Sequence, residues 1–476
     1  MSTIWHRKPS DVVIRRRRQQ ELEPVHIELG AVRSRSRVFE PTMILAYSFI
    51  IIIAVGTGLL MLPFTHHGEG FVPFADALFT ATSAATVTGL ITQSTPEFWT
   101  RSGQIIILVL IFAGGLGIIT IASSSLILAG QRISLSQRLL MREALGTSNF
   151  GDVTRVTIQV VFWAVAIQAV GFVVLLAGFI TIYSPSEAIW QAAFQAVSAF
   201  NNAGFTSLLE SESLIGFQSN KFLIPVIGLL IVLGSLSYWV IIDGVQHKRW
   251  NRLTLNTKIV LATTLGLIAV GALVLLLAEY TNPRTLGPLP LLDKLFTALF
   301  QSINRTAGFS TVEIGETTSV VQIFYALLMF IGGASASVAG GIKVTTAAIL
   351  AGFLVAALRG RDRTVMFGKT IPHLQVQWAL VILGIAFLGV GTTTVVVSLA
   401  EPDIELLDVL FESVSAFGTV GFSTGITSSL SDISLFALSA SMFVGRVVPP
   451  MMILLALAAP NQIATHHYAI EDIVIG

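Results

Sequence analysis

The sequence contains no cysteine and little charge, and both shortages narrow what the chain can be. Without cysteine among its 476 residues, it can form neither a disulfide framework nor a metal site built on thiolates. Only 12% of the residues are charged and 53% are hydrophobic, whereas about a quarter of a soluble domain is charged. Because a bilayer leaves no water to satisfy backbone polar groups, the composition predicts an all-α polytopic membrane protein.

Apolar runs long enough to cross a bilayer recur along the chain. A hydrocarbon core of about 30 Å needs roughly 20 apolar residues in a helix. Eight stretches meet this length: 43–63, 103–129, 156–182, 222–242, 257–278, 320–358, 376–400 and 433–459. The polar stretch before the first run does not resemble a cleavable signal peptide. We therefore expect eight spans.

A short amphipathic stretch ending in a glycine occurs four times, each time between two apolar runs. The stretches begin at Phe79, Phe194, Phe300 and Phe411 and reach Gly89, Gly204, Gly308 and Gly421. These glycines lie 115, 104 and 113 residues apart. In three copies a phenylalanine stands ten residues before the glycine, but Phe300 stands eight before Gly308, so the third helix should pack differently. The repetition predicts one module used four times.

The module reads as span, short pore-type helix, glycine turn and span. A helix of about three turns cannot cross the bilayer, so it must re-enter and line a cavity. Glycine supplies the positive φ that such a turn requires. Four pseudo-symmetric modules, with eight spans and four re-entrant pore helices around a central ion pore, would form a ring of carbonyls able to hold a dehydrated potassium ion.

The module boundaries follow from this repetition. We predict these segments: a basic cytoplasmic tail at 1–41, repeat 1 at 42–130, repeat 2 at 131–245, repeat 3 at 246–360 with an intramembrane loop at 332–342, repeat 4 at 361–459, and a C-terminal cytoplasmic tail at 460–476.

Charge placement predicts the orientation of the chain. Twenty-one of the 28 lysines and arginines fall in the N-terminal tail and in the three loops between repeats, which places both termini in the cytoplasm. The pore-type helices then enter from outside, where acidic residues flank them. Those acids would concentrate cations, or they are simply tolerated in outer loops; the sequence leaves both interpretations open.

The second span of repeat 3 is unlike the others. Four glycines and two serines fall between Gly332 and Gly341, and each glycine costs a helix about 1 kcal/mol relative to alanine. We expect a broken helix with an intramembrane loop; the alternative is a small-residue packing face. Arg446 lies within the last span, where it should face the interior as a pore-lining charge or as a tie to backbone carbonyls. Arg305 is expected to clamp Glu412 on the neighbouring pore helix.

These features together resemble the Trk/Ktr/HKT superfamily of potassium transporters, and the length resembles the bacterial Ktr-type membrane subunit. The resemblance covers about residues 42–476 and rests on the four glycine turns in register. It implies four filter segments: Val87-Thr88-Gly89-Leu90, Asn202-Ala203-Gly204-Phe205, Thr306-Ala307-Gly308-Phe309 and Thr419-Val420-Gly421-Phe422. Glycine at position 89 favours potassium, since relatives with serine at the first filter glycine tend toward sodium.

The resemblance also implies a gate and partners. The gate residues would be Gly332, Gly333, Ala334, Ser335, Ala336, Ser337, Val338, Ala339, Gly340, Gly341, Lys343 and Arg446. The resembled subunits work as homodimers in the cell membrane, docked on a cytoplasmic ring of nucleotide-binding regulatory subunits. The chain itself has no Walker A motif and no placed GxGxxG, so we expect no cofactor in it.

Other functions remain as alternatives. Within transport, the alternative is a sodium-permeable or weakly selective cation pathway, and coupling to sodium stays open. A polytopic membrane enzyme is disfavoured because no HExxH, nucleophile constellation or paired acids occur at membrane depth. Nucleic-acid binding by the arginine-rich tail is disfavoured on a polytopic membrane protein; anionic lipid is the simpler partner for that tail.

Overall fold

The computed structural model describes residues 36–117, 153–208 and 213–458. The predicted tails lie outside these ranges, except that helix α1 begins at Ser36, inside the tail that was predicted to extend to residue 41. The end of predicted repeat 1 and the beginning of predicted repeat 2, at 118–152, also lie outside them. The regular secondary structure of the described residues is almost entirely helical, as the composition predicted.

Most of the helices fall into four groups that follow one another along the chain, each with a first helix, a short second helix and a third helix. The first group is α1 (Ser36–Leu60), α2 (Phe74–Thr86) and α4 (Arg101–Leu116). The single turn α3 (Thr95–Phe98) lies between α2 and α4. The second is α7 (Val153–Phe179), α8 (Pro185–Phe200) and α9 (Leu223–Ser235). The third is α11 (Leu255–Glu279), α12 (Leu291–Ile303) and α13 (Ser319–Phe330), and the fourth is α15 (His373–Ala400), α16 (Leu406–Gly418) and α17 (Asp432–Ala458). Linking elements are α10 (Tyr238–Gln246), α14 (Val344–Leu358), β1 (Val365–Met366) and β2 (Lys369–Thr370).

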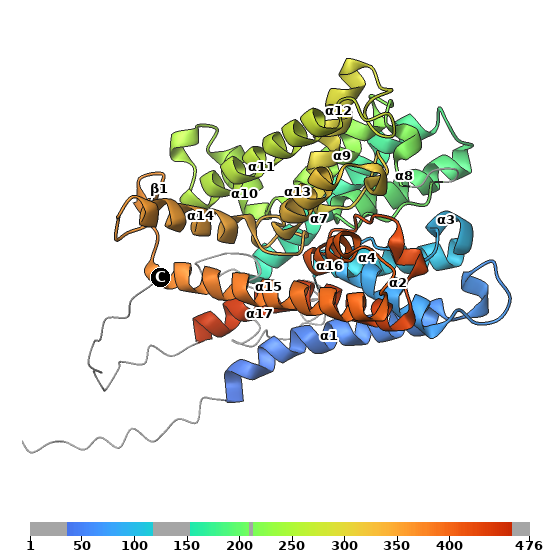
Figure 1. Cartoon of the computed structure of the whole chain (residues 1–476), viewed down its shortest axis with the longest axis horizontal. Helices are drawn as coiled ribbons and strands as arrows, with labels where there is room; N and C mark the ends of the chain where they lie inside the picture. Colours follow the sequence, from blue (N-terminus) through green and yellow to red (C-terminus); the bar gives the residue numbers. More distant parts are fainter. Residues whose placement is uncertain (1–35, 118–152, 209–212, 459–476) are drawn as a thin grey trace, which may run out of the picture.

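The four groups contact one another in a closed cycle (Figure 1). The third helix of each group packs on the short helix of the next: α4 on α8, α9 on α12, α13 on α16, and α17 back on α2. The last contact joins the fourth group to the first, so the short helices are surrounded by the longer ones. The packing therefore repeats the order of the sequence around one centre.

The lengths of the helices agree only in part with the eight predicted spans. Among the described residues, four helices are long and apolar enough to cross a membrane: 158–179, 255–279, 373–400 and 432–449. The helices α4, α13, α14 and the apolar part of α1 are shorter, and the predicted span 103–129 is described only to residue 117. The predicted span 320–358 is interrupted, since α13 ends at Phe330 and α14 begins at Val344.

The apolar span predicted at 222–242 is not one continuous helix, because α9 and α10 meet at an angle of 100°. Ser237 starts the new helix, and its hydroxyl accepts a hydrogen bond from the Val240 amide at 3.4 Å. The bend follows Gly234, where an added Cβ would lie 1.8 Å from the Phe200 carbonyl oxygen. Close contact with the preceding glycine turn and a new helix cap thus divide this span.

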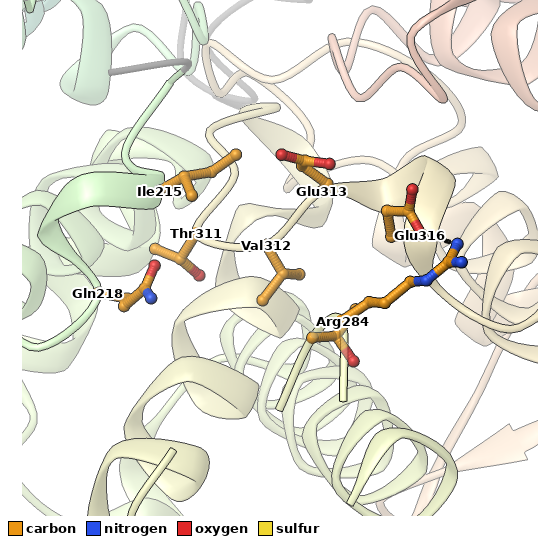
Figure 2. A pocket seen from close by; sticks show the side chains of 8 residues that line it. Ile215, Gln218, Arg284, Thr311, Val312, Glu313 and Glu316 are labelled. Atoms are coloured by element: carbon orange, nitrogen blue, oxygen red, sulfur yellow. Dashed lines mark hydrogen bonds and ion pairs between the residues drawn. The ribbon is translucent and has the colours of Figure 1, made fainter. Parts of the chain in front are cut away.

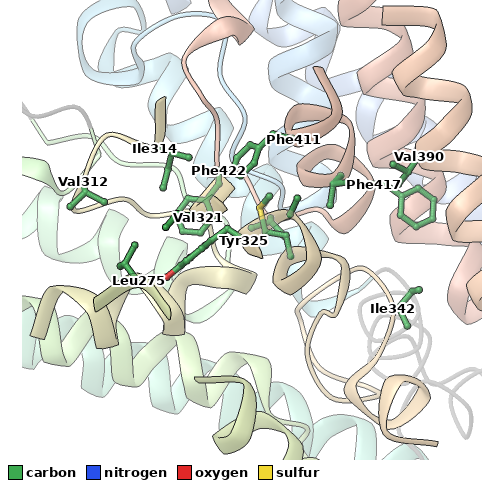
Figure 3. Packing of buried hydrophobic residues seen from close by; sticks show 14 of the residues in the cluster. Leu275, Val312, Ile314, Val321, Tyr325, Ile342, Val390, Phe411, Phe417 and Phe422 are labelled. Atoms are coloured by element: carbon green, nitrogen blue, oxygen red, sulfur yellow. The ribbon is translucent and has the colours of Figure 1, made fainter. Parts of the chain in front are cut away.

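The buried apolar residues form clusters that join consecutive groups. The largest cluster connects α11, α13, α15 and α16, and Figure 3 shows Tyr325 and Phe422 among its rings. Their ring centroids lie 6.1 Å apart at an interplanar angle of 66°. Tyr325 belongs to the third group and Phe422 follows the glycine of the fourth. The core is therefore shared between groups rather than confined to each one.

Candidate functional site

The four glycine turns approach one another in a closed ring at the centre of the groups. All four glycines have positive φ, as predicted: +95° at Gly89, +73° at Gly204, +70° at Gly308 and +98° at Gly421. A Cβ added to each would meet the carbonyl oxygen just before the next glycine, at Ala203 (2.3 Å), Ala307 (2.5 Å), Val420 (2.3 Å) and Thr88 (2.1 Å) respectively. The last of these closes the ring. Only glycine fits at these positions, because both the φ angle and the close approach exclude a side chain.

Serines of the short helices hold two of the glycine turns by their backbone. The Gly89 amide donates to Ser83 Oγ at 3.0 Å, and the Gly421 amide donates to Ser415 Oγ at 3.1 Å. These are the serines six residues before each glycine. With its N–H engaged by the helix behind it, the turn leaves its carbonyl oxygens available on the side that faces the other turns.

The third turn is built differently, as the shifted phenylalanine predicted. A 3₁₀ turn at Asn304–Thr306 follows α12, and the Gly308 amide donates to the Asn304 carbonyl at 3.0 Å. Ser302 points away and donates to the Ile268 carbonyl on α11 at 2.8 Å. A hydrogen bond from Asn202 Nδ2 to Thr306 Oγ1, at 2.9 Å, ties this turn to the second one.

The apolar residues that accompany each glycine pack into the cluster of the preceding group. Phe205 lies among residues of the first group, Phe309 among those of the second, Phe422 among those of the third, and Leu90 among those of the fourth. The phenylalanines that open the four motifs, Phe79, Phe194, Phe300 and Phe411, do the same. The variable side chains of the glycine turns thus anchor the ring from outside.

Three polar residues of the short helices brace the segments that follow Gly204, Gly308 and Gly421, a role that sequence reasoning missed. Gln195 Nε2 donates to Thr206 Oγ1 at 2.6 Å, and Gln301 Oε1 accepts from the Thr311 amide at 3.2 Å. Glu412 Oε1 accepts from the Thr424 amide at 3.1 Å and from the Ser423 hydroxyl. All three side chains are fully buried. The available signal was a glutamine or glutamate near the middle of each of these three short helices, in a segment flanked by apolar runs.

Three residues two positions before the glycines also adopt left-handed conformations: Val87 (φ 59°), Asn202 (φ 57°) and Thr419 (φ 47°). This region is disfavoured for β-branched side chains such as valine and threonine, and each such residue costs on the order of 1–3 kcal/mol. The strain sits at the ring of glycine turns, which agrees with a functional constraint at this place.

Residues 331–343 form a non-helical loop directly beside this ring. An added Cβ at Gly340 would meet Thr419 Oγ1 at 1.9 Å, and one at Gly341 would meet the Gly418 carbonyl oxygen at 3.2 Å. The loop closes on itself where the Gly332 amide donates to the Ile342 carbonyl at 2.6 Å. Ala336, at its tip, has a φ of 61°. The glycine-rich stretch therefore packs against the fourth glycine turn, and the predicted helix break is present.

The bend between α9 and α10 supplies two further attachments for the loop. The Ala334 amide donates to the Ser235 carbonyl at 2.9 Å, and the Val338 amide donates to the Gly234 carbonyl at 3.3 Å. Within the loop, Ser337 Oγ donates to the Ala334 carbonyl and Lys343 Nζ donates to the Ala339 carbonyl. A loop of small residues is thus held mainly through backbone groups.

Two arginines, the buried Arg305 and the half-buried Arg446, hold the loop from other elements. Arg446, on α17, donates to the Val338 carbonyl at 2.5 Å and to the Gly114 carbonyl of α4 at 2.9 Å. Arg305 donates to the Ile331 carbonyl and, at 3.3 Å, to the Gly332 carbonyl. The predicted pairing of Arg305 with Glu412 is wrong. The carbonyls at the end of α13 lack helical partners and accept hydrogen bonds from the Arg305 guanidinium instead. Glu412 braces the segment that follows Gly421.

The outer side of the third turn carries a pocket of about 300 Å³ (Figure 2). Thr311 and Val312 line it together with Gln218, and Glu313 projects at its rim. Arg284 Nη1 pairs with Glu316 Oε2 at 2.5 Å, and Arg101 likewise pairs with Glu187 near the second short helix. Glu187 and Glu316, two of the acids that flank the predicted pore helices, are therefore already paired with cations. Among the described residues, no group of three or more histidines, aspartates or glutamates could hold a metal ion.

Comparisons with known proteins agree with this architecture. The family model of TrkH, described as cation transport protein, matches residues 30–465. The chain belongs to this family of cation transport proteins. It is 36% identical over 416 residues to the Ktr system potassium uptake protein B of Bacillus subtilis, covering 86% of this chain and 92% of that protein.

Two further relatives extend the comparison. The potassium/sodium uptake protein NtpJ of Enterococcus hirae is 36% identical over 449 residues, which cover 93% of this chain and 99% of that protein. The crystal structure of the potassium transporter TrkH from Vibrio parahaemolyticus has a TM-score of 0.66 at 18% identity, covering 90% of this chain and 86% of that one. At that identity the likeness concerns the fold alone.

Proposed function

We propose that this chain takes up potassium across the cell membrane through a filter formed by the four glycine turns. The observation that carries the proposal is the closed ring of contacts, in which each glycine lies against the carbonyl that precedes the next. Backbone carbonyls arranged around one axis can replace the hydration shell of potassium. The surrounding groups support the proposal by holding the turns from behind, through serine hydroxyls and buried apolar side chains.

Loop 331–343 acts in this proposal as the gate. It packs against the fourth glycine turn, and contacts from α9, α17 and Arg305 hold it there. A loop of glycine, alanine and serine can move aside with little steric hindrance, and Arg446 restrains it through Val338. Opening then requires that these hydrogen bonds to backbone carbonyls be broken.

Regulation would come from outside this chain. Two relatives named Ktr system potassium uptake proteins, B and D of Bacillus subtilis, are by name parts of a system. We infer that this chain likewise works as a homodimer whose cytoplasmic face docks a ring of nucleotide-binding subunits, with both termini on that face. Co-purification with such a subunit, and a nucleotide-dependent change in flux, would be the supporting result.

A second candidate is a sodium-permeable or weakly selective pathway, because one relative is named a potassium/sodium uptake protein. Uptake of radioactive potassium and sodium into liposomes that contain the purified chain separates the two. Preference for potassium supports the proposal. Equal uptake of both ions favours the second candidate, and uptake of neither contradicts transport by the chain alone.

A further inference from the structure

Two exposed rings meet at the end of the molecule opposite the short helices. Trp250, in the turn between α10 and α11, lies 6.1 Å from Phe367, at the tip of the β1–β2 hairpin, with an interplanar angle of 68°. Their side chains are 45% and 48% exposed. The contact joins two loops that are far apart in sequence, since one precedes α11 and the other follows α14 (Figure 1). We call loop 247–254 and hairpin 365–370, with the basic residues beside them, the basic aromatic patch.

Phe367 adopts a strained backbone conformation at the turn of the hairpin. The hairpin pairs Met366 with Lys369, and the two turn residues Phe367 and Gly368 have φ angles of +48° and +76°. Turns of this kind favour asparagine followed by glycine, and a bulky aromatic residue at positive φ is an outlier. Backbone strain that persists at an exposed side chain points to a function for that side chain.

Basic residues lie close in sequence to both rings. The exposed basic residues of the patch are Lys248, Arg249, Arg252, Arg359, Arg361, Arg363 and Lys369. None of them forms an ion pair within the part of the chain that the structure describes. Of the two acids nearby, Asp243 already accepts hydrogen bonds from Thr254 and contacts His247, which leaves Asp362. The patch is therefore strongly positive and not neutralised from within.

The patch also lies where two long apolar helices begin. Helix α11 starts at Leu255 and α15 at His373, each within a few residues of a ring or a cation of the patch. Helix α14 ends beside it at Leu358, whose side chain is 80% exposed. Tryptophan and other aromatic residues concentrate at membrane–water interfaces, and clustered basic residues beside a span attract anionic lipid. Aromatic rings also occur in protein interfaces, so what favours lipid here is the position of the rings beside the ends of apolar helices.

We propose that the basic aromatic patch binds the headgroup of an anionic phospholipid, with Trp250 and Phe367 seated at the headgroup boundary. Positive charge alone is explained by membrane orientation, but the paired rings and the strained turn are not. The hairpin packs on α14, since an added Cβ at Gly352 would meet Met366 Sδ at 3.2 Å. The first residue of α14, Val344, donates its amide to the Gly333 carbonyl in the proposed gate at 3.0 Å. Bound lipid would thus steady the helix that follows the gate; this last step rests on the proposed transport function.

The binding test does not depend on transport. Delipidated protein is titrated with phosphatidylglycerol and with phosphatidylcholine, and bound lipids are counted by native mass spectrometry. We expect a preferred phosphatidylglycerol site that Arg249→Gln and Lys369→Gln each weaken about fivefold, since a basic residue near an anionic surface contributes roughly that factor. Phe367→Asn should weaken binding of both lipids while relieving the turn, so a loss cannot be attributed to misfolding. The control, Lys221→Gln, removes a cation that pairs with Asp293 beside the third short helix.

Unchanged phosphatidylglycerol binding in the variant that combines Arg249→Gln and Lys369→Gln would overturn the proposal. A loss of phosphatidylglycerol binding no greater than that of the Lys221→Gln control would also overturn it. If the combined variant keeps its lipid and instead fails to bind the regulatory subunit, the patch is a protein-docking surface and the lipid assignment is wrong. In liposomes, phosphatidylglycerol should change the flux of the parent and leave that of the combined variant unaffected. If neither the parent nor any variant transports potassium, the transport proposal fails while the lipid counts still decide this one.

Discussion

Gly89→Ser places a side chain where the ring of glycine turns has no room for one. The new Cβ would lie 2.3 Å from the Ala203 carbonyl oxygen, whereas real Cβ atoms keep at least 3.0 Å, so the carbonyl must move by about 0.7 Å. The obstacle is backbone and cannot rotate away. Positive φ costs a serine about 1–2 kcal/mol, and overpacking typically adds about 1–3 kcal/mol. Because the serine can relieve this strain only by pushing the Ala203 carbonyl away, we expect a carbonyl of the ring to be displaced.

If about 1.4–2.8 kcal/mol of that cost falls on potassium relative to sodium, discrimination drops about 10- to 100-fold. The assay compares initial uptake of the two ions into liposomes that contain equal amounts of folded protein. Gly70→Ser is the matched control, since Gly70 has a similar φ of +87° and nothing within 4 Å of an added Cβ. The control should keep the parent's ion ratio. If Gly89→Ser keeps it too, this turn takes no part in selectivity.

Further variants test three other parts of the structure. Ser415→Ala leaves the half-buried Gly421 amide without its acceptor, a loss of about 1–3 kcal/mol that should lower potassium preference by up to about tenfold. Ser302→Ala, whose hydroxyl faces α11, should not lower it, and equal ion ratios in the two variants would refute the difference. Deleting residues 334–339 should raise potassium flux at an unchanged ion ratio and Arg446→Gln should raise it less; unchanged flux in a folded deletion variant would mean that the loop is only a packing element. Hydrogen bonds from Ser431 hold the pKa of Glu401 below its usual value. The ionised Glu401 carboxylate therefore stabilises the folded protein at neutral pH, and this stabilisation is lost as pH falls through the lowered pKa. Glu401→Gln should therefore lower the free energy of unfolding at neutral pH but not at acidic pH, by less than about 1 kcal/mol because water screens this partly exposed carboxylate. Thermal unfolding in detergent measures the difference, and a pH-independent loss would contradict it.

Local chemistry made part of this structure predictable. The positive φ of the four glycines and the break after Phe330 follow from glycine content and spacing. The different geometry of the third turn follows from the two-residue shift of Phe300, which the 3₁₀ turn after α12 absorbs. These features depend on a few neighbouring residues, and for that reason a single sequence reveals them.

Features that depend on distant contacts were not predictable. The 100° bend after α9 has Gly234 and the capping serine Ser237 as its local signals, but it also depends on the approach of Gly234 to the distant Phe200. Arg305 was assigned to Glu412 because charge complementarity is visible in sequence. The carbonyls that it actually contacts become free acceptors only once α13 ends and folds back. Backbone acceptors of this kind leave no trace in side-chain identity.

The central claim is that the four glycine turns together hold a potassium ion. The most direct test is anomalous diffraction from crystals grown with rubidium, which substitutes for potassium. We expect a strong peak surrounded by the carbonyl oxygens of Thr88, Ala203, Ala307 and Val420, and a loss of that peak in crystals of Gly89→Ser. A well-ordered ring without a peak at its centre, or rubidium bound only elsewhere, would contradict it.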